Sequence, residues 1–143
     1  MLPRFPFQRH MLSLLLLAAC AGPNAHASLK PKTILLNKAA FHYLDKGAGD
    51  PVVFVHGSLG DYRTWEHQVG PFAKHYRVIA YSRRYHYPNR WPAGARDSLT
   101  THVNDLLALV SSLRLGRVHL VGTSSGALIA LLAALRNPAM VRT

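Results

Sequence analysis

The chain has 143 residues, of which 49% are hydrophobic and 16% are charged, and it carries a formal net charge of +11. This composition suits one globular domain with a hydrophobic core and argues against disorder, while a single cysteine excludes an internal disulfide framework and a cysteine-based zinc site. The basic residues are scattered along the chain, so we attribute the charge to composition rather than to a nucleic-acid or anionic-surface partner.

Residues 1–27 have the pattern of a bacterial export signal. Two arginines precede an apolar run over 11–19, which is too short to span a bilayer. Two processing sites compete. One is a lipoprotein signal over 1–19 that resembles a lipobox and leaves a lipidated Cys20, and the other is ordinary cleavage after a small-x-small site at the end of 1–27. Both predict export, either secreted or periplasmic, or anchored by lipid to the outer membrane.

A short lead-in over residues 28–32 precedes the domain, which we place at 33–143. Two strands are predicted at 33–37 and 40–44, joined as a hairpin. After a dense turn cluster, the fully apolar segment 51–55 has the composition of a strand buried in a parallel sheet.

Helices and strands alternate through the rest of the chain. A helical pattern from Tyr62, which Gly70-Pro71 should kink or split, leads to a strand at 77–81. A second helix ends before Gly116 and shows apolar residues at helical spacing. Those residues are Val103, Leu106, Leu107, Val110 and Leu113. The order predicts an α/β fold with a doubly wound, mostly parallel sheet and right-handed crossovers.

The most informative stretch is a strand, a sharp turn and a helix in direct succession. An apolar strand over 117–121 ends in Gly122, Ser124 and Gly126 follow at alternate positions, and a helix-forming run covers 127–135. Such a turn strains the serine backbone and leaves the hydroxyl free above the carboxyl ends of the strands. The alternative is a glycine turn in another kind of βα unit.

Three features together resemble the α/β-hydrolase family, and the resemblance covers residues 33–143. His56-Gly57 ends an apolar strand, the serine elbow lies at Ser124, and a loop rich in arginine follows the strand at 77–81. The resemblance implies the N-terminal part of a hydrolase sheet and ester-like acyl hydrolysis of a small molecule, with no cofactor and no metal. Serine at the elbow separates the chain from the dehalogenases and epoxide hydrolases of the family, which carry aspartate there.

The resemblance also implies a role for each motif residue. Ser124 would attack the substrate, and the backbone N–H groups of Ser58 and Ser125 would form the oxyanion hole. The remaining motif positions are structural in this interpretation: His56, Gly57, Gly122 and Gly126.

The family places the acid and the histidine of the catalytic triad beyond the strands found here. The chain ends at Thr143, where a sixth strand would begin, so we expect both partners and the C-terminal strands to be missing. Without a base, Ser124 is an ordinary alcohol. We therefore expect either a truncated hydrolase or an inactive domain that binds a partner, for which the unpaired edge of the strand at 117–121 is a site of self-association.

The basic and aromatic run 83–91 has two interpretations. It has the residue types that stack on a nucleic acid strand, but its position beside the elbow and the expected export favour a wall of the substrate cleft. Arg84 is a candidate structural tie across this loop. Asp97 and Asp105 are interpreted as caps or surface ties rather than catalytic acids, and no histidine has a spacing that aims it at Ser124.

Overall fold

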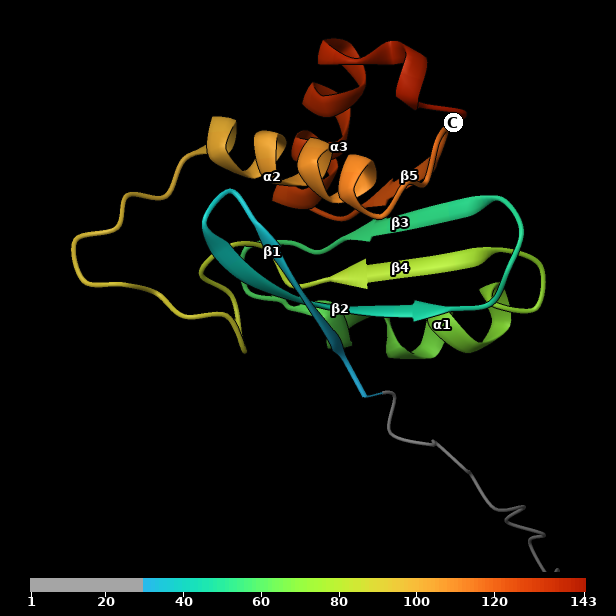
Figure 1. Ribbon diagram of the computed structural model, residues 1–143, viewed down its shortest axis with the longest axis horizontal. Coiled ribbons are helices and arrows are strands. Elements are labelled where there is room, and N and C mark those ends of the chain that lie inside the picture. The colour runs from blue at the N-terminus through green and yellow to red at the C-terminus, as the bar shows by residue number, and fades with distance from the viewer. Residues whose placement is uncertain (1–29) are drawn as a thin grey trace, which may run out of the picture.

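The computed structural model describes residues 30–143, so the expected signal segment and Cys20 lie outside the described residues. Five strands form one sheet in the order β1-β2-β4-β3-β5 (Figure 1). They are β1 (Lys32–Leu36), β2 (Ala39–Lys46), β3 (Pro51–Val55), β4 (Arg77–Tyr81) and β5 (His119–Gly122). β4, β3 and β5 run parallel, whereas β1 and β2 are antiparallel. The predicted α/β class and doubly wound sheet are confirmed.

Helices cover both faces of the sheet (Figure 1). They are the 3₁₀ turn η1 (Tyr62–Trp65), α1 (Glu66–Phe72), α2 (Leu99–Ser112), α3 (Ser125–Arg136) and the 3₁₀ turn η2 (Pro138–Met140). α2 and α3 pack together over one face, and α1 covers the other. None of the helices in residues 30–143 is long and apolar enough to span a membrane.

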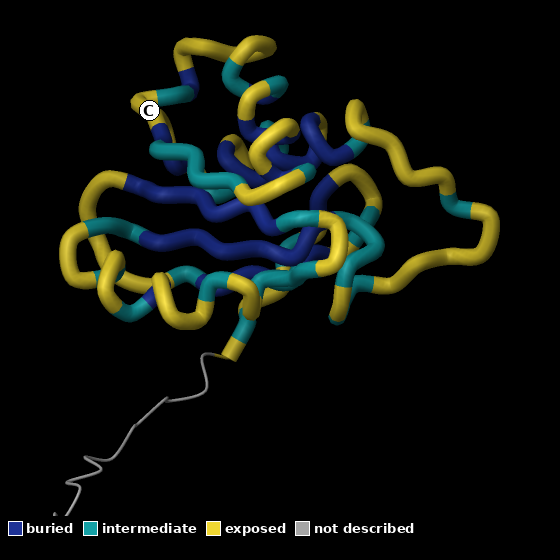
Figure 2. Tube along the Cα trace, turned by 180° about the vertical axis from the view of Figure 1, so that it is seen from behind, coloured by how far each residue is buried: buried dark blue, intermediate teal, exposed yellow. Residues whose placement is uncertain are grey.

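Strand β3 is buried along its whole length, as its uniformly apolar sequence predicts. Val53 and Val55 face the core beneath α2 and α3, whereas Val52 and Phe54 face the core beneath α1. Figure 2 shows the central strands as continuous buried paths, with exposed stretches in the loops and along the outer sides of the helices. The carboxyl end of β3 is therefore held rigidly in the middle of the sheet.

The helix expected from Tyr62 differs in its boundaries from the sequence prediction. A 3₁₀ turn comes first, because the Asp61 carboxylate accepts the Arg63 N–H at 2.8 Å and caps it. α1 then continues through Gly70 and ends at Phe72 rather than splitting. Pro71 lies in the last turn of α1, one residue before the helix ends.

The outer edge of β5 has backbone hydrogen-bond partners, so the prediction of an unpaired edge is wrong for this strand. Val118 bridges Val141 in parallel, and the Arg142 N–H donates to the Val118 carbonyl at 2.8 Å. The Leu120 N–H donates to the Thr143 carbonyl at 2.9 Å. The last residues of the chain therefore lie along β5, because its backbone groups need partners.

An ion pair with a buried carboxylate joins three segments that are distant in sequence. Arg84, after β4, donates to both carboxylate oxygens of Asp105 on α2 at 2.7 Å, and Asn37 in the β1–β2 turn donates to the same carboxylate at 2.8 Å. Arg84 thus forms a tie across the loop. Asp105 is 1% exposed, so it is a buried tie and not the surface tie or cap that we expected.

Replacing Asp105 by alanine should lower the free energy of unfolding by about 2–4 kcal/mol, because it leaves the partly buried Arg84 guanidinium without a countercharge. Urea denaturation measures this loss. The control is Lys32→Ala. The Lys32 side chain pairs with Asp45 but is 56% exposed, so its removal should lower the free energy of unfolding by less than about 1 kcal/mol. Equal losses in the two variants would contradict the structural role of the buried pair.

Candidate active site

Ser124 occupies the turn between β5 and α3 in a backbone conformation that side chains rarely adopt. Its φ is 51° and its ψ is −128°, and the residue is exposed to solvent. The neighbouring Thr123 N–H donates to the Val55 carbonyl at 3.1 Å, which attaches the turn to the end of β3. The strained turn therefore presents the Ser124 hydroxyl at the carboxyl edge of the sheet.

Two glycines allow this turn to pack against its neighbours. A Cβ atom at Gly126 would collide with the Val55 carbonyl oxygen and lie 2.5 Å from the His56 carbonyl oxygen. A Cβ atom at Gly122 would lie 2.6 Å from the Ala127 Cα. A side chain at either position would force α3 away from the sheet and displace the turn.

The loop after β3 lies against the serine turn. A Cβ atom at Gly57 would lie 3.2 Å from the Ser124 Cβ and 3.7 Å from its hydroxyl oxygen. The Ser58 hydroxyl donates to the Ser125 hydroxyl at 2.9 Å. The structure therefore brings Ser58, Ser124 and Ser125 together at the carboxyl ends of two neighbouring parallel strands, where ligands bind in open α/β sheets.

His56 is fully buried, and both of its ring nitrogens have partners. Nε2 accepts the backbone N–H of Arg83 at 2.9 Å, so the proton lies on Nδ1, which donates to the Gly57 carbonyl at 2.7 Å. Burial lowers the pKa of His56 to about 3, which keeps the ring neutral. His56 holds the loop after β3 and offers no free nitrogen to Ser124.

Arg83 and His86 belong to the site, although the sequence analysis gave them no role beyond that of the run 83–91 as a cleft wall. Arg83 is 3% exposed, and its Nη2 donates to the Gly57 carbonyl at 3.0 Å and to the His86 Nε2 at 3.2 Å. The His86 Nδ1 donates to the Gly60 carbonyl at 3.1 Å. Burial and the neighbouring Arg83 charge lower the pKa of His86. The sequence signal that could have identified them is their position directly after the buried strand β4, since side chains there lie at the carboxyl edge of the sheet.

A cavity of about 300 Å³ opens beside the serine turn. It is lined by residues from the loop after β3, the loop after β4 and the start of α2 and α3, including Ser58, Ser125, Arg83, His86, Trp91 and His102. Three of these come from the basic and aromatic run 83–91. The run therefore forms the wall of a cleft, as its position beside the elbow suggested.

His102 and Asp97 lie side by side in the lining of this cavity. The distance from His102 Nε2 to Asp97 Oδ1 is 2.6 Å, and His102 is buried. Burial lowers the pKa of His102. Asp97 is thus a tie to His102, whereas Ser98 caps α2 by accepting the Thr101 N–H at 3.1 Å. Within residues 30–143 no group of three or more His, Cys, Asp or Glu side chains could hold a metal ion.

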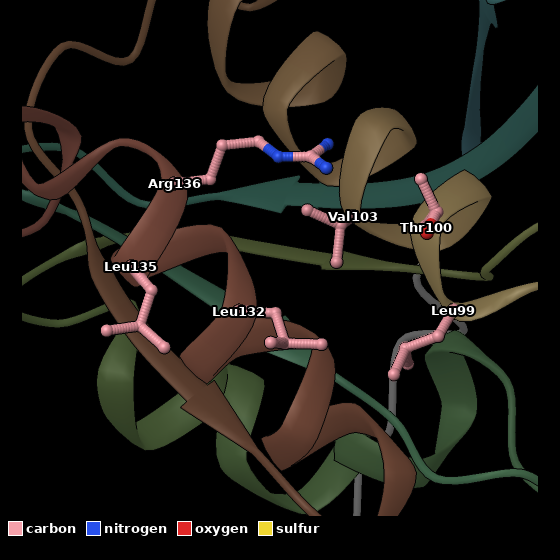
Figure 3. A pocket seen from close by; sticks show the side chains of 6 residues that line it. All are labelled: Leu99, Thr100, Val103, Leu132, Leu135 and Arg136. Atoms are coloured by element: carbon pink, nitrogen blue, oxygen red, sulfur yellow. The ribbon is translucent and has the colours of Figure 1, made fainter.

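A larger cavity of about 400 Å³ lies between α2 and α3. Figure 3 shows leucine and valine side chains from both helices facing one another there, with Arg136 extending across the gap. This groove is lined mostly by apolar side chains, and Thr100 and Arg136 are its polar residues. We assign the chemistry to the smaller cavity, because Ser58 and Ser125 line it.

The sequence of residues 50–143 matches the model of the family described as alpha/beta hydrolase fold. The chain belongs to the alpha/beta hydrolase fold family. It is 34% identical over 113 residues to the (E)-2-((N-methylformamido)methylene)succinate hydrolase of Acinetobacter baylyi, covering 78% of this chain and 42% of that protein. It is 36% identical over 101 residues to the 2-hydroxy-6-oxo-2,4-heptadienoate hydrolase of Pseudomonas putida, covering 68% and 37% of the two chains.

Solved structures of this hydrolase family have the same arrangement of elements. An epoxide hydrolase from Vigna radiata superposes with a TM-score of 0.78 at 26% identity, covering 83% of this chain and 39% of that one. A meta-cleavage product hydrolase from Pseudomonas fluorescens superposes with a TM-score of 0.73 at 29% identity, covering 77% and 42%. The chain therefore spans about two fifths of the length of these relatives.

Stability should fall with acid because His56 is neutral in the folded protein. Its pKa of about 3 lies below the ordinary value of 6.5, so between these pH values the unfolded chain binds a proton that the folded chain does not. The contribution of neutral His56 to the free energy of unfolding is complete above about pH 6.5 and falls by about 1.4 kcal/mol per pH unit towards pH 3. Urea denaturation between pH 7.5 and pH 4.5 measures this slope.

The variant His56→Asn should be less stable at pH 7.5 but should show a shallower decline with acid. The control is His119→Gln in β5, which lies outside the cavity and should keep the wild-type slope. An unchanged slope in His56→Asn would show that another group causes the acid sensitivity.

Proposed function

We propose that the protein is a serine hydrolase in which Ser124 attacks the acyl carbon of an ester-like substrate. The observation that carries the proposal is the strained turn that sets Ser124 beside Ser58 and Ser125. Attack places negative charge on the carbonyl oxygen, and the N–H groups of Ser58 and Ser125 would stabilise it. At the start of α3 the Gly126 and Ala127 N–H groups donate to the Thr123 and Ser124 carbonyls, whereas Ser125 is the first residue of the helix and its N–H has no acceptor within it.

The proton of Ser124 needs a base, and His56 and His86 are engaged elsewhere, since both ring nitrogens of each have hydrogen-bond partners. His102 is 4% exposed, and its Nε2 faces Asp97 rather than the serine turn. We propose that the base and its acid come from outside these 143 residues, which agrees with the share of the relatives that the chain spans. The acyl-enzyme would then be hydrolysed by water.

The substrate we propose is a small acyl compound that is uncharged or acidic. Arg83 gives the cavity a positively charged wall, and Trp91 supplies an apolar one. The names of two relatives describe derivatives of organic acids, a succinate and a heptadienoate. A serine at the elbow favours an ester-type substrate over an epoxide.

We also propose that the protein is exported. The basic start and the apolar run over 11–19 support a signal, and Cys20 supports a lipid anchor as one of two processing routes. The two routes differ in the N-terminus of the mature protein, which is a lipidated Cys20 in one case and an unmodified Ser28 in the other.

A second function, an inactive domain that binds a partner or a second copy of itself, is favoured by one observation. α3 exposes three leucines, Leu128, Leu131 and Leu135, with exposed fractions of 46%, 57% and 70%. An apolar helix face of this kind is commonly covered by another surface. Concentration-dependent association in solution, without any reaction at Ser124, would distinguish this function from catalysis.

In the whole protein, Ser124→Ala should abolish both ester hydrolysis and covalent labelling by a fluorophosphonate, because the nucleophile is removed while the fold is kept. Intact-protein mass spectrometry detects the label. The control Ser112→Ala changes an exposed serine at the end of α2 and should label like the wild type. Labelling of Ser124→Ala would refute the assignment of the nucleophile, and an unlabelled wild type would favour the binding function.

The protein purified from its own cells with an antibody against residues 33–143 should have a mass above 15.8 kDa if the base lies outside these residues. Its N-terminus should be Cys20 with lipid or Ser28 without it. Mass spectrometry of the intact protein and of its N-terminal peptide measures both. A species that starts at Met1 would contradict export, and one with no additional residues would contradict the external base.

A further inference from the structure

We propose that Arg83 is a positioning residue that orients and polarises the peptide bond between Gly57 and Ser58, and so strengthens the Ser58 N–H as an oxyanion donor. The proposal rests on the assignment of Ser124 as nucleophile. It deepens that assignment, because it explains how one of the two donors is prepared before the substrate arrives. The observation behind it is the set of contacts on the Gly57 carbonyl.

Three donors converge on this single carbonyl oxygen. His56 Nδ1 lies at 2.7 Å, Arg83 Nη2 at 3.0 Å and the Gly60 backbone nitrogen at 3.2 Å. A backbone carbonyl has two lone pairs, so three donors are a dense set. One donor carries a full positive charge, and hydrogen bonds from charged donors are about twice as strong as neutral ones. The orientation of this peptide is therefore tightly determined.

The Gly57 carbonyl and the Ser58 N–H belong to the same planar, resonance-stabilised peptide unit. Because a trans peptide directs its N–H away from its carbonyl, anchoring the carbonyl also sets the direction of the N–H. Hydrogen bonds to the oxygen withdraw electrons from the nitrogen and make the N–H a better donor. Ser58 itself contacts Ser125, and Gly57 lies against Ser124, so this donor stands beside the nucleophile.

The charge of Arg83 is not neutralised by a carboxylate in the part of the chain that the structure describes. Arg63, Arg77 and Arg84 are each paired with an aspartate, but Arg83 is in no ion pair there. Its other acceptor is the neutral His86 ring, and its buried Nε has no partner. Asp97 lines the same cavity and attracts Arg83 electrostatically, but the two form no ion pair.

A buried charge without a countercharge is costly, and a neutral donor would suffice to hold a loop in place. The charge has a use if it acts through the peptide on developing negative charge at Ser58. Oxyanion donors are effective when they are fixed before the reaction starts. His86 adds to this rigidity, since it accepts from Arg83 and donates to the Gly60 carbonyl at the other end of the loop.

The test compares Arg83→Gln and Arg83→Lys with the wild type in the whole protein. The readouts are the rate at which a fluorophosphonate labels Ser124, and kcat and KM for a p-nitrophenyl ester. Arg83→Gln should lower the labelling rate and kcat roughly fivefold to tenfold with KM unchanged, since the interaction acts in the transition state. Arg83→Lys keeps the charge, so it should fold and recover part of the loss.

The matched control is Arg84→Lys, because the adjacent Arg84 binds Asp105 and makes no contact with the Gly57 carbonyl in the loop after β3. It should lower the melting temperature and leave kcat unchanged. An unchanged kcat in a folded Arg83→Gln would overturn the proposal, as would an equal fall in Arg84→Lys. A loss that appears in KM alone would also overturn it.

A second measurement keeps this proposal separate from the proposed function. The amide proton of Ser58 should move upfield in the NMR spectrum of Arg83→Gln, and less in Arg83→Lys, because a less polarised N–H is more shielded. If the wild type does not react at Ser124, the proposed function fails, and this shift alone decides whether Arg83 polarises the peptide. An unmoved Ser58 amide would overturn the inference whatever the activity.

Discussion

The close approach of helix α3 to the end of strand β3 is the constraint on which the site depends. Gly126 has no room for a side chain against the Val55 and His56 carbonyls, and the Thr123 N–H closes the turn onto the same strand. The Ser124 backbone then has to adopt a φ of 51°. A strained residue of this kind persists only where its surroundings determine it, and here those surroundings are the buried core of the sheet.

The adjacent residues Arg83 and Arg84, in the loop after β4, have different partners and different roles. Arg84 binds the buried Asp105 and joins the β1–β2 turn, the loop and α2 into one body. Arg83 instead donates hydrogen bonds to the Gly57 carbonyl and to the neutral His86 ring. Charge paired with charge stabilises the frame of the molecule, whereas the unpaired guanidinium adds positive potential next to the residues that would meet an oxyanion.

The sequence predicted most of the fold because local patterns were strong. The buried strand β3, the helix α2 and the strand-turn-helix around Ser124 follow from apolar periodicity and from glycine positions. The predictions failed where a long-range contact decided the outcome. The edge of β5 is paired by residues 141–143, which the sequence analysis did not expect.

The sequence by itself determined the hydrolase fold class and the candidate nucleophile, because both depend on residue types at fixed spacing. Only the tertiary structure decided the surroundings of that serine. The partners of Arg83, the tautomer of His56 and the burial of Asp105 depend on contacts between segments far apart in the chain. Residue spacing along one strand or helix carries no information about such contacts, since they form only when the sheet brings its loops together.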